Sequence, residues 1–255
     1  MKADAVKISV ITVVFNNVRT ISDCLASVAA QTHPDVEHIV VDGGSTDGTI
    51  DKVKFQGTRV SRFISEPDRG MYDALNKGLD LATGEVIAVL NSDDVYTDAT
   101  VLAQVAETLI EKRLDSCYGD IVYVRPDDLG KVVRHWKSGE YRRERFRNGW
   151  MPPHTACFIR KSVYDKYGRF DTSFDIASDY EILLRFFYKH EATTAYIPKV
   201  LVKMRTGGRS AGTLRNIIKA NAECYRSWGK NGLRANPARL LLKPLSKLLQ
   251  LRRMP

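Results

Sequence analysis

Two adjacent acidic residues, Asp93 and Asp94, stand two residues after an apolar run at residues 86–90 that has the composition of a buried strand. Two carboxylates at the end of a buried strand are energetically costly unless a positive charge offsets them. A divalent cation with oxygen ligands, shared with the phosphates of a substrate, is a common solution. The pair therefore predicts a cation site; the alternative is that it caps a helix expected to begin near Asp98.

Polar residues also follow two other expected strands. Asn16 comes at the end of the run 7–15, and Asp42 follows the run 36–41 and opens the glycine-rich turn 43–49. In an open parallel sheet, ligands bind at the carboxyl ends of the strands. We therefore expect a ligand site where the three ends meet, with Asp42 contacting a ribose or a base. The alternative for Asp42 is that it only holds an Asx-type turn.

The elements that must position these residues alternate between β-branched runs and helical patterns, which indicates βαβ units and a largely parallel sheet. Thr20 and Asp23 have the spacing of a capping box at the start of the first helix. Further expected elements are a strand at 60–65, helices at 71–82 and about 98–112, strands near 116–118 and 121–124, a helix at 178–190 and a strand at 196–202. Residues 130–148 are irregular and basic, and the stretch around Phe146 is interpreted as a loop facing solvent or substrate.

The composition and charge of the chain limit its class. With 255 residues and 44% apolar content, the chain can form one large α/β domain and is neither disordered nor a multi-pass membrane protein. The net charge of +9 lies entirely in residues 215–255, where ten Lys or Arg accompany the single acid Glu223. This asymmetry predicts a domain at 1–214 and a basic helical extension at 215–255 that meets phosphates. The scattered cysteines indicate neither a zinc site nor disulfides, and the N-terminus has no signal-peptide pattern, so we expect a cytosolic protein.

Five segments together resemble the family 2 glycosyltransferases, which have the GT-A fold. They are SVITVVFN (9–16), VDGGSTDGT (41–49), EPDRGMYDALNKG (66–78), ATGEVIAVLNSDD (82–94) and SDYEILLR (178–185). Their order, spacing and strand context agree over about residues 7–212. The resemblance implies an α/β fold with a mostly parallel central sheet flanked by helices. It also implies an inverting, metal-dependent transfer of a sugar from a nucleotide sugar, with UDP as the expected nucleotide, to a hydroxyl of a glycan or lipid-linked acceptor.

The resemblance also implies roles for single residues. Asp179 would be the general base, and His154 would lie on the acceptor side. Asp94, with Asp93 beside it, would bind Mg²⁺ or Mn²⁺; Asn91 stands where relatives often have an acid, which leaves one fewer ligand. The residues expected to contact the nucleotide sugar are Val14, Asn16, Asp42, Asp68, Arg69, Asn76, Asp93, Arg205 and Arg209.

Alternative interpretations remain open. An acid in the first turn of a helix capped by Ser178 would account for Asp179 without catalysis. A sugar-1-phosphate nucleotidyltransferase would need a phosphate loop rich in glycine and arginine after the first strand, where FNNVRT stands; the GxGxxG and P-loop patterns are also missing from the sequence. A non-catalytic protein that binds nucleotide sugars is disfavoured because Asp94 and Asp179 are both present.

Leucines alternate with Lys and Arg from Pro237 onward, in a segment too short and too charged to span a bilayer. Such a segment suits the membrane interface. We therefore expect residues 237–255 to hold the protein on the anionic inner face of the cell membrane, where a lipid-linked acceptor would be found. The alternative is that these leucines pack on protein. Because the segment lacks aromatic residues for base stacking, nucleic acid is not an expected partner.

Overall fold

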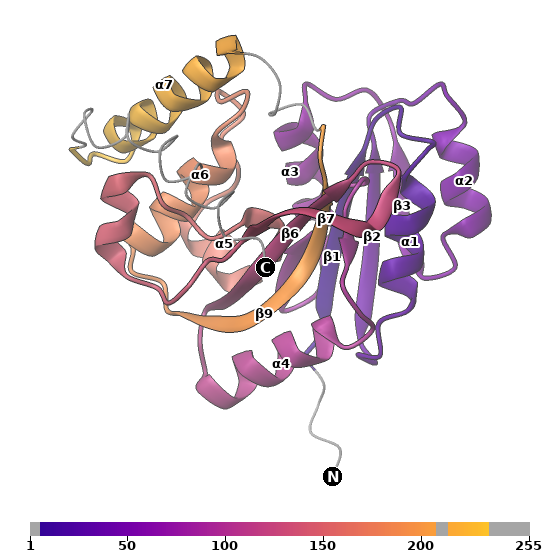
Figure 1. Cartoon of the computed structure of the whole chain (residues 1–255), viewed down its shortest axis with the longest axis horizontal. Helices are drawn as coiled ribbons and strands as arrows, with labels where there is room; N and C mark the ends of the chain where they lie inside the picture. Colours follow the sequence, from indigo (N-terminus) through magenta and orange to yellow (C-terminus); the bar gives the residue numbers. More distant parts are fainter. Residues whose placement is uncertain (1–5, 208–213, 235–255) are drawn as a thin grey trace.

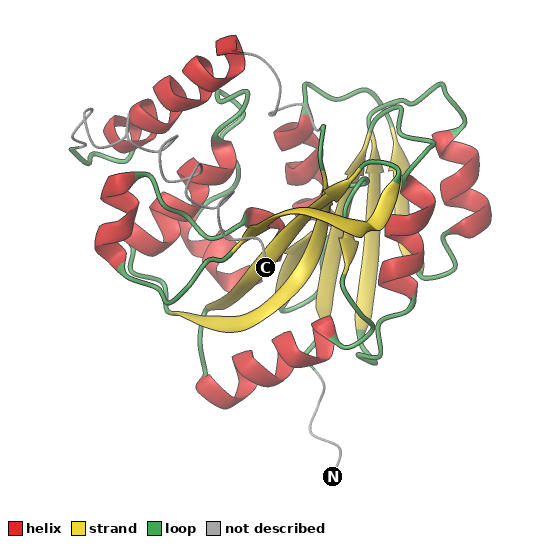
Figure 2. Cartoon of the chain, viewed as in Figure 1, coloured by secondary structure: helices red, strands yellow, loops and turns green. Residues whose placement is uncertain are grey.

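The computed structural model describes residues 6–207 and 214–234. In this part of the chain nine strands form one sheet, in the order β3-β2-β1-β4-β8-β6-β9-β5, with β7 paired to β6. The strands are β1 Ile8–Val14, β2 Val36–Asp42, β3 Val60–Ser65, β4 Val86–Val89, β5 Val95–Tyr96, β6 Ser116–Arg125, β7 Asp128–Trp136, β8 Cys157–Arg160 and β9 Thr194–Arg205. The helices are α1 Ile21–Ala29, α2 Thr49–Gln56, α3 Met71–Leu81, α4 Val101–Lys112, α5 Lys161–Tyr167, α6 Ser178–Leu183 and α7 Leu214–Lys230. Figure 2 shows the sheet with helices around it.

The first half of the sheet is parallel, as expected from the βαβ pattern. β1 lies between β2 and β4, and β3 lies beyond β2, all in parallel register. Every residue of β1 is buried, because both faces of the strand are covered: Ile11 and Val13 share a core cluster with α3, and Val10 shares the opposite cluster with α1 and α4. Burial on both faces explains the unbroken apolar run in the sequence.

The second half of the sheet is mixed, and one prediction for it is wrong. β6 pairs in parallel with β9 and antiparallel with β8 and β7. The segment 128–136, most of which we expected to be irregular, is the strand β7. Its sequence hides the strand because β7 pairs with β6 alone and is mostly exposed, so no apolar run marks it.

The interpretation of Phe146 as part of an exposed loop is also wrong. Phe146 is fully buried, with its ring edge-on to Trp150 at a centroid distance of 5.5 Å. It lies in a 3-10 helix, Arg143–Asn148, and the arginines of this helix contact other protein groups. Arg143 donates to the Tyr188 carbonyl (2.9 Å), and Arg147 donates to the Tyr188 hydroxyl (2.8 Å).

The cap expected at Thr20 and the cap considered at Ser178 do not form. The Thr20 hydroxyl donates to Asn17 Oδ1 at 2.8 Å and makes no capping bond at the start of α1. Ala177, not Ser178, occupies the capping position of α6, and the Ser178 hydroxyl is buried inside the helix. α6 also ends earlier than expected, because the chain continues from Leu184 to Lys189 as a π-helix.

α7 lies beside α6, at one side of the molecule (Figure 1). Cys224 and Trp228 of α7 are buried in the same core cluster as Ile182 and Leu183 of α6. The boundary expected at 214/215 stays a prediction, and Arg209 and the segment 237–255 lie outside the described residues. None of the helices within 6–207 and 214–234 has the length and apolar content needed to cross a membrane.

Candidate active site

The loops after β1, β2 and β4 meet at one edge of the sheet. The Asn16 N–H donates to Ser45 Oγ, and Asn16 Oδ1 accepts from the Thr46 N–H, both at 2.8 Å. Asn16 has a φ of 48°, a left-handed conformation that asparagine tolerates better than most residues. Asn17 Nδ2 donates to Ser92 Oγ at 2.8 Å, which ties the first loop to the loop of the acidic pair.

Asp42 is fully buried and shapes the glycine-rich turn. Its carboxylate accepts hydrogen bonds from the N–H groups of Gly44 (3.0 Å) and Ser45 (2.9 Å) and from the hydroxyls of Ser65 (2.7 Å) and Ser45. The Val14 carbonyl accepts from the Gly43 N–H at 2.9 Å. The turn-holding role of Asp42 is therefore visible, and its contact with a ribose or a base stays a prediction.

The loop after β3 approaches the same turn closely. A Cβ atom at Gly43 would lie 2.5 Å from Asp68 Oδ2 and 3.3 Å from the ring of Phe15, so a larger residue at this position would displace the Asp68 side chain. Phe15, which the sequence analysis missed, is 57% exposed at the end of β1 and offers a flat apolar face. Arg69 is exposed and pairs with Asp73 at 3.1 Å.

Two residues predicted to contact the nucleotide sugar form hydrogen bonds within the protein. The Asn76 side chain donates to the Phe170 carbonyl (2.9 Å) and accepts from the Phe170 N–H (3.1 Å), so it joins α3 to the segment before α6. Arg205 is buried and donates to the Asp93 carbonyl (2.8 Å), the Pro126 carbonyl (3.1 Å) and the Asp23 carboxylate (2.5 Å). Arg205 thus fixes the backbone of the acidic pair, and direct contacts of Asn76 and Arg205 with a donor stay predictions.

The acidic pair has the surroundings of a cation site. Asp94 is fully buried; its Oδ2 accepts from Asn91 Nδ2 at 3.0 Å, and its Oδ1 has no hydrogen-bond partner among the described residues. Burial raises the pKa of Asp94 well above its ordinary value, and the charge of Asp93 raises it further. Burial also raises the pKa of Asp93. A cation beside the pair would offset the cost of both buried charges.

A cation beside the acidic pair would take its other ligands from groups other than the His, Cys, Asp and Glu side chains of the described residues. Within residues 6–207 and 214–234 no group of three or more His, Cys, Asp or Glu side chains could hold a metal. Mg²⁺ is usually bound through one or two carboxylates together with substrate phosphates and water. Asp93 and Asp94 fit that pattern.

Asp179 and His154 come together on the other side of the site. Asp179 is the second residue of α6, and its Oδ1 accepts from the Tyr180 N–H at 2.7 Å. Burial lowers the pKa of the His154 imidazole, and the nearby charge of Asp179 raises it. Burial raises the pKa of the Tyr72 phenol, and Asp179 raises it further. Asp179 therefore lies close to both His154 and Tyr72.

Tyr123 and Arg134 border this site and were missed by the sequence analysis. Burial raises the pKa of the Tyr123 phenol. The charge of Arg134 lowers this pKa, whereas the charges of Asp94 and Asp179 raise it further. The phenol is thus within electrostatic reach of both carboxylates. Arg134 lies opposite Tyr123 in the β6–β7 pair, with its guanidinium carbon 3.9 Å from the ring centre. Their contact escaped notice because the segment 130–148, which contains Arg134, was expected to be irregular.

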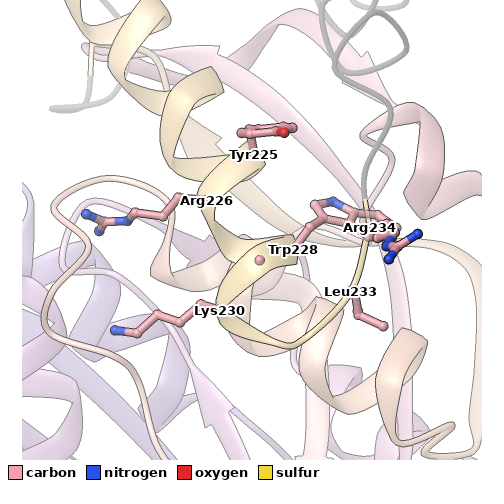
Figure 3. Close-up of a pocket in the computed structure, with 7 residues that line it drawn as sticks. Tyr225, Arg226, Trp228, Lys230, Leu233 and Arg234 are labelled. Atoms are coloured by element: carbon pink, nitrogen blue, oxygen red, sulfur yellow. The ribbon is translucent and has the colours of Figure 1, made fainter.

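A separate depression of about 620 Å³ opens at the C-terminal end of α7 (Figure 3). It is lined by Tyr225, Arg226, Trp228, Gly229, Lys230, Leu233 and Arg234. None of the residues predicted to bind the donor or to act as the base lines this depression.

Solved glycosyltransferases share the fold. S. aureus TarS matches with a TM-score of 0.68 at 19% identity, over 94% of this chain but 43% of TarS. The 1–349 fragment of TarS in complex with UDP-GlcNAc matches with a TM-score of 0.67, over 92% of this chain and 69% of the fragment. The mannosyltransferase PcManGT of Pyrobaculum calidifontis, in complex with GDP-Man and Mn²⁺, matches with a TM-score of 0.65 at 21% identity, over 94% of this chain and 67% of that one. The fold is therefore α/β and GT-A-like.

Sequence relatives agree with the fold. A PGL/p-HBAD biosynthesis glycosyltransferase of Mycobacterium tuberculosis (strain H37Rv) is 31% identical over 210 residues, which cover 81% of this chain and 79% of the relative. An uncharacterized glycosyltransferase of the same strain is 31% identical over 245 residues, which cover 91% and 89%. The model of the family described as "Glycosyl transferase family 2" matches residues 9–168. The chain with the acidic pair after β4 thus belongs to glycosyl transferase family 2, and it is an enzyme of that family.

Proposed function

We propose that the enzyme is an inverting, metal-dependent glycosyltransferase that moves a sugar from a UDP-sugar to a hydroxyl of a glycan or lipid-linked acceptor. The observation that carries the proposal is the buried carboxylate of Asp94, whose Oδ1 has no hydrogen-bond partner among the described residues, together with a second carboxylate, Asp179, that acts with Asp94 on the pKa of Tyr123. The choice of donor is supported by TarS, which was solved with UDP and with UDP-GlcNAc.

The acidic pair would hold Mg²⁺ or Mn²⁺ through Asp94 and Asp93, together with the donor phosphates. The unpartnered Asp94 Oδ1 and the raised pKa values of both carboxyls support this assignment. PcManGT was solved with GDP-Man and Mn²⁺. When bound, the cation supplies positive charge that stabilises the departing nucleoside diphosphate. Arg205 keeps the acidic pair in place by its bond to the Asp93 carbonyl.

The chain's own residues would perform the remaining work. Asp179 would accept the proton of the acceptor hydroxyl as that oxygen attacks the anomeric carbon, and attack from the face opposite the leaving group inverts the configuration. His154, close to Asp179, would face the acceptor. The donor's nucleotide would lie along the loops of Val14, Asn16, Asp42, Asp68 and Arg69, with Asn76, Arg205 and Arg209 as further contacts.

The experiment is a screen of UDP-GlcNAc, UDP-glucose and GDP-mannose for Mn²⁺-dependent hydrolysis, which needs no acceptor. We expect hydrolysis of a UDP-sugar that stops with EDTA and returns with Mn²⁺ or Mg²⁺. Asp179→Asn should lower turnover by about 10²- to 10⁴-fold and leave UDP binding unchanged, because it removes only proton acceptance. Full turnover in EDTA would contradict the metal assignment.

The place of action is a further part of the proposal. A lipid-linked acceptor would be met at the cytoplasmic face of the cell membrane, with residues 237–255 as a reversible, peripheral contact with anionic lipid. The basic and leucine-rich composition of that segment supports this assignment.

A further inference from the structure

Glu223 of α7 forms hydrogen bonds with the chain segment just before α6. The side chain is buried, and its carboxylate accepts hydrogen bonds from three consecutive backbone N–H groups, those of Asp175 (3.2 Å), Ile176 (2.9 Å) and Ala177 (2.9 Å). Ala177 is the capping position of α6 and offers no side-chain acceptor. Because buried backbone N–H groups need an acceptor, Glu223 fixes from α7 the turn that leads into α6.

The same turn is held from its other side by α3. The Tyr72 hydroxyl donates to the Ile176 carbonyl at 2.6 Å. The turn 175–177 is therefore fixed between an acceptor on α7 and a donor on α3. Asp179 follows two residues after Ala177, and its charge acts on Tyr72 and His154. The position of the Asp179 carboxylate thus depends on how this turn is held.

α7 is anchored to α6 so that Glu223 stays in register with the turn. Trp228 Nε1 donates to the Tyr180 hydroxyl at 3.0 Å, and Asn231 Nδ2 donates to Glu181 Oε1 at 3.0 Å. Trp228 is 1% exposed and packs against Tyr188 at a centroid distance of 4.8 Å. In Figure 3, Arg226 and Lys230 extend from the same stretch of α7, and they bond to the Ser173 carbonyl and hydroxyl, just before the turn.

We propose that Glu223 is a positioning residue for Asp179. By fixing the turn 175–177, it holds the Asp179 carboxylate where the acceptor hydroxyl must deliver its proton. α7 is then a part of the catalytic machinery, although it follows the segments that resemble the family. This inference rests on the role proposed above for Asp179.

Substitutions at Glu223 test the inference by the hydrolysis of UDP-GlcNAc, UDP-glucose or GDP-mannose, whichever turns over fastest with Mn²⁺. Glu223→Ala removes all three acceptor contacts and should lower kcat by about 10²-fold, the effect of a misplacement of about 1 Å in a catalytic group. Glu223→Gln keeps an oxygen for Ile176 and Ala177 and should recover most of that loss. The Kd of UDP should stay unchanged in both variants, because the donor loops are not touched.

Two controls separate positioning from stability. Lys219→Ala removes an exposed ion pair between Lys219, which lies on the same helix as Glu223, and the side chain of Asp175. Because the backbone bonds made by Glu223 stay in place, kcat should be unchanged. Val105→Ala opens a cavity where α4 packs, in a core cluster different from that of α7, and should lower Tm without lowering kcat at 25 °C. A Glu223 variant that loses no more activity than Val105→Ala at equal Tm loss overturns the proposal.

A double-mutant cycle with Asp179→Asn shows through which residue Glu223 acts. If Glu223 positions Asp179, adding Glu223→Gln or Glu223→Ala to Asp179→Asn should change turnover by less than about twofold, because the two effects are coupled. Full additivity overturns the proposal. A fully active Asp179→Asn variant would instead contradict the proposed function, whereas an inactive one with normal Glu223 variants contradicts only the positioning role.

Deuterium exchange gives a readout that does not depend on turnover or on folding of the alanine variant. In Glu223→Gln the amides of residues 175–179 should exchange faster than in the wild type, because one N–H loses its acceptor, while the amides of β1 and β2 should be unchanged. Wild-type exchange at 175–179 would show that Glu223 does not hold the turn.

Discussion

Asp42 and Asp94 are both fully buried acidic residues at the ends of strands, yet their carboxylates have opposite surroundings. Asp42 accepts four hydrogen bonds, whereas Asp94 accepts one and leaves Oδ1 without a partner among the described residues. The change from Asp to Asn should therefore have opposite effects at the two positions. An unsatisfied buried group costs about 1 to 3 kcal/mol, and more when it is charged.

We expect Asp94→Asn to raise the free energy of unfolding by about 1 to 2 kcal/mol at pH 7 in EDTA, because it removes a buried charge. In a chain of this length that corresponds to roughly 2 to 8 °C in Tm. Asp42→Asn should lower the free energy of unfolding by about 2 to 4 kcal/mol, because an amide NH₂ then faces N–H and hydroxyl donors. Asp94→Asn should abolish turnover despite its greater stability.

The pH dependence supplies a second check on Asp94. Burial raises its pKa above the ordinary 3.8, so between that value and the raised one the native state binds more protons than the unfolded state. The stability contributed by this group therefore falls as the pH rises through that window. The advantage of Asp94→Asn should shrink as the pH approaches 4.

Urea unfolding followed by tryptophan fluorescence measures both variants, with and without Mn²⁺ and UDP. Ligands present at 100 times their Kd should add about 2.7 kcal/mol to the wild type and much less to Asp94→Asn. Two results would refute the reasoning: an Asp94→Asn variant less stable than the wild type at pH 7, or equal stabilisation of both proteins by Mn²⁺ and UDP.

Three further outcomes are expected. Burial lowers the pKa of His38 to about 3, so the unfolded state binds more protons than the native state below pH 6.5. The free energy of unfolding therefore decreases as the pH is lowered, by roughly 1.4 kcal/mol per pH unit. Between pH 6.5 and 5 the wild type should lose about 2 kcal/mol more than His38→Gln in urea unfolding. Arg134→Ala should weaken UDP binding about tenfold but uridine binding little, as measured by calorimetry, if its guanidinium meets the diphosphate; equal losses for both ligands would contradict that contact. Deleting residues 237–255 should abolish salt-sensitive co-sedimentation with anionic vesicles and leave UDP binding intact, and continued sedimentation would contradict the membrane assignment.

The parallel half of the sheet could be predicted because burial on both faces leaves a continuous apolar run, as in β1. The helix α3 was also predicted to within one residue of its observed end, because its apolar residues repeat at helical spacing. β7 could not be predicted in this way, since it pairs with β6 alone and is mostly exposed. Phe146 was misplaced because a short 3-10 helix has no 3.6-residue pattern.

The candidate site was predictable where function coincides with a strand end. Asp93 and Asp94 stand out because they come a few residues after a buried strand. Tyr123 and Arg134 do not, because their contact depends on the pairing of β6 with a strand that the sequence conceals. The role of Glu223 could not be predicted from the sequence. Its carboxylate accepts three hydrogen bonds from residues 46 to 48 positions away, and no local pattern encodes such contacts.

The hydrogen bond from Arg205 to the Asp93 carbonyl affects when the site can form during translation. It joins residues 112 positions apart, and at ribosomal rates of about 5 to 20 residues per second that stretch takes roughly 6 to 22 seconds to synthesise. During this interval β1 to β4 can pair, but the acidic pair lacks its arginine clamp. A nascent chain halted before Arg205 should carry the acidic residues without an ordered site, so that competence to bind the donor arises only late in translation.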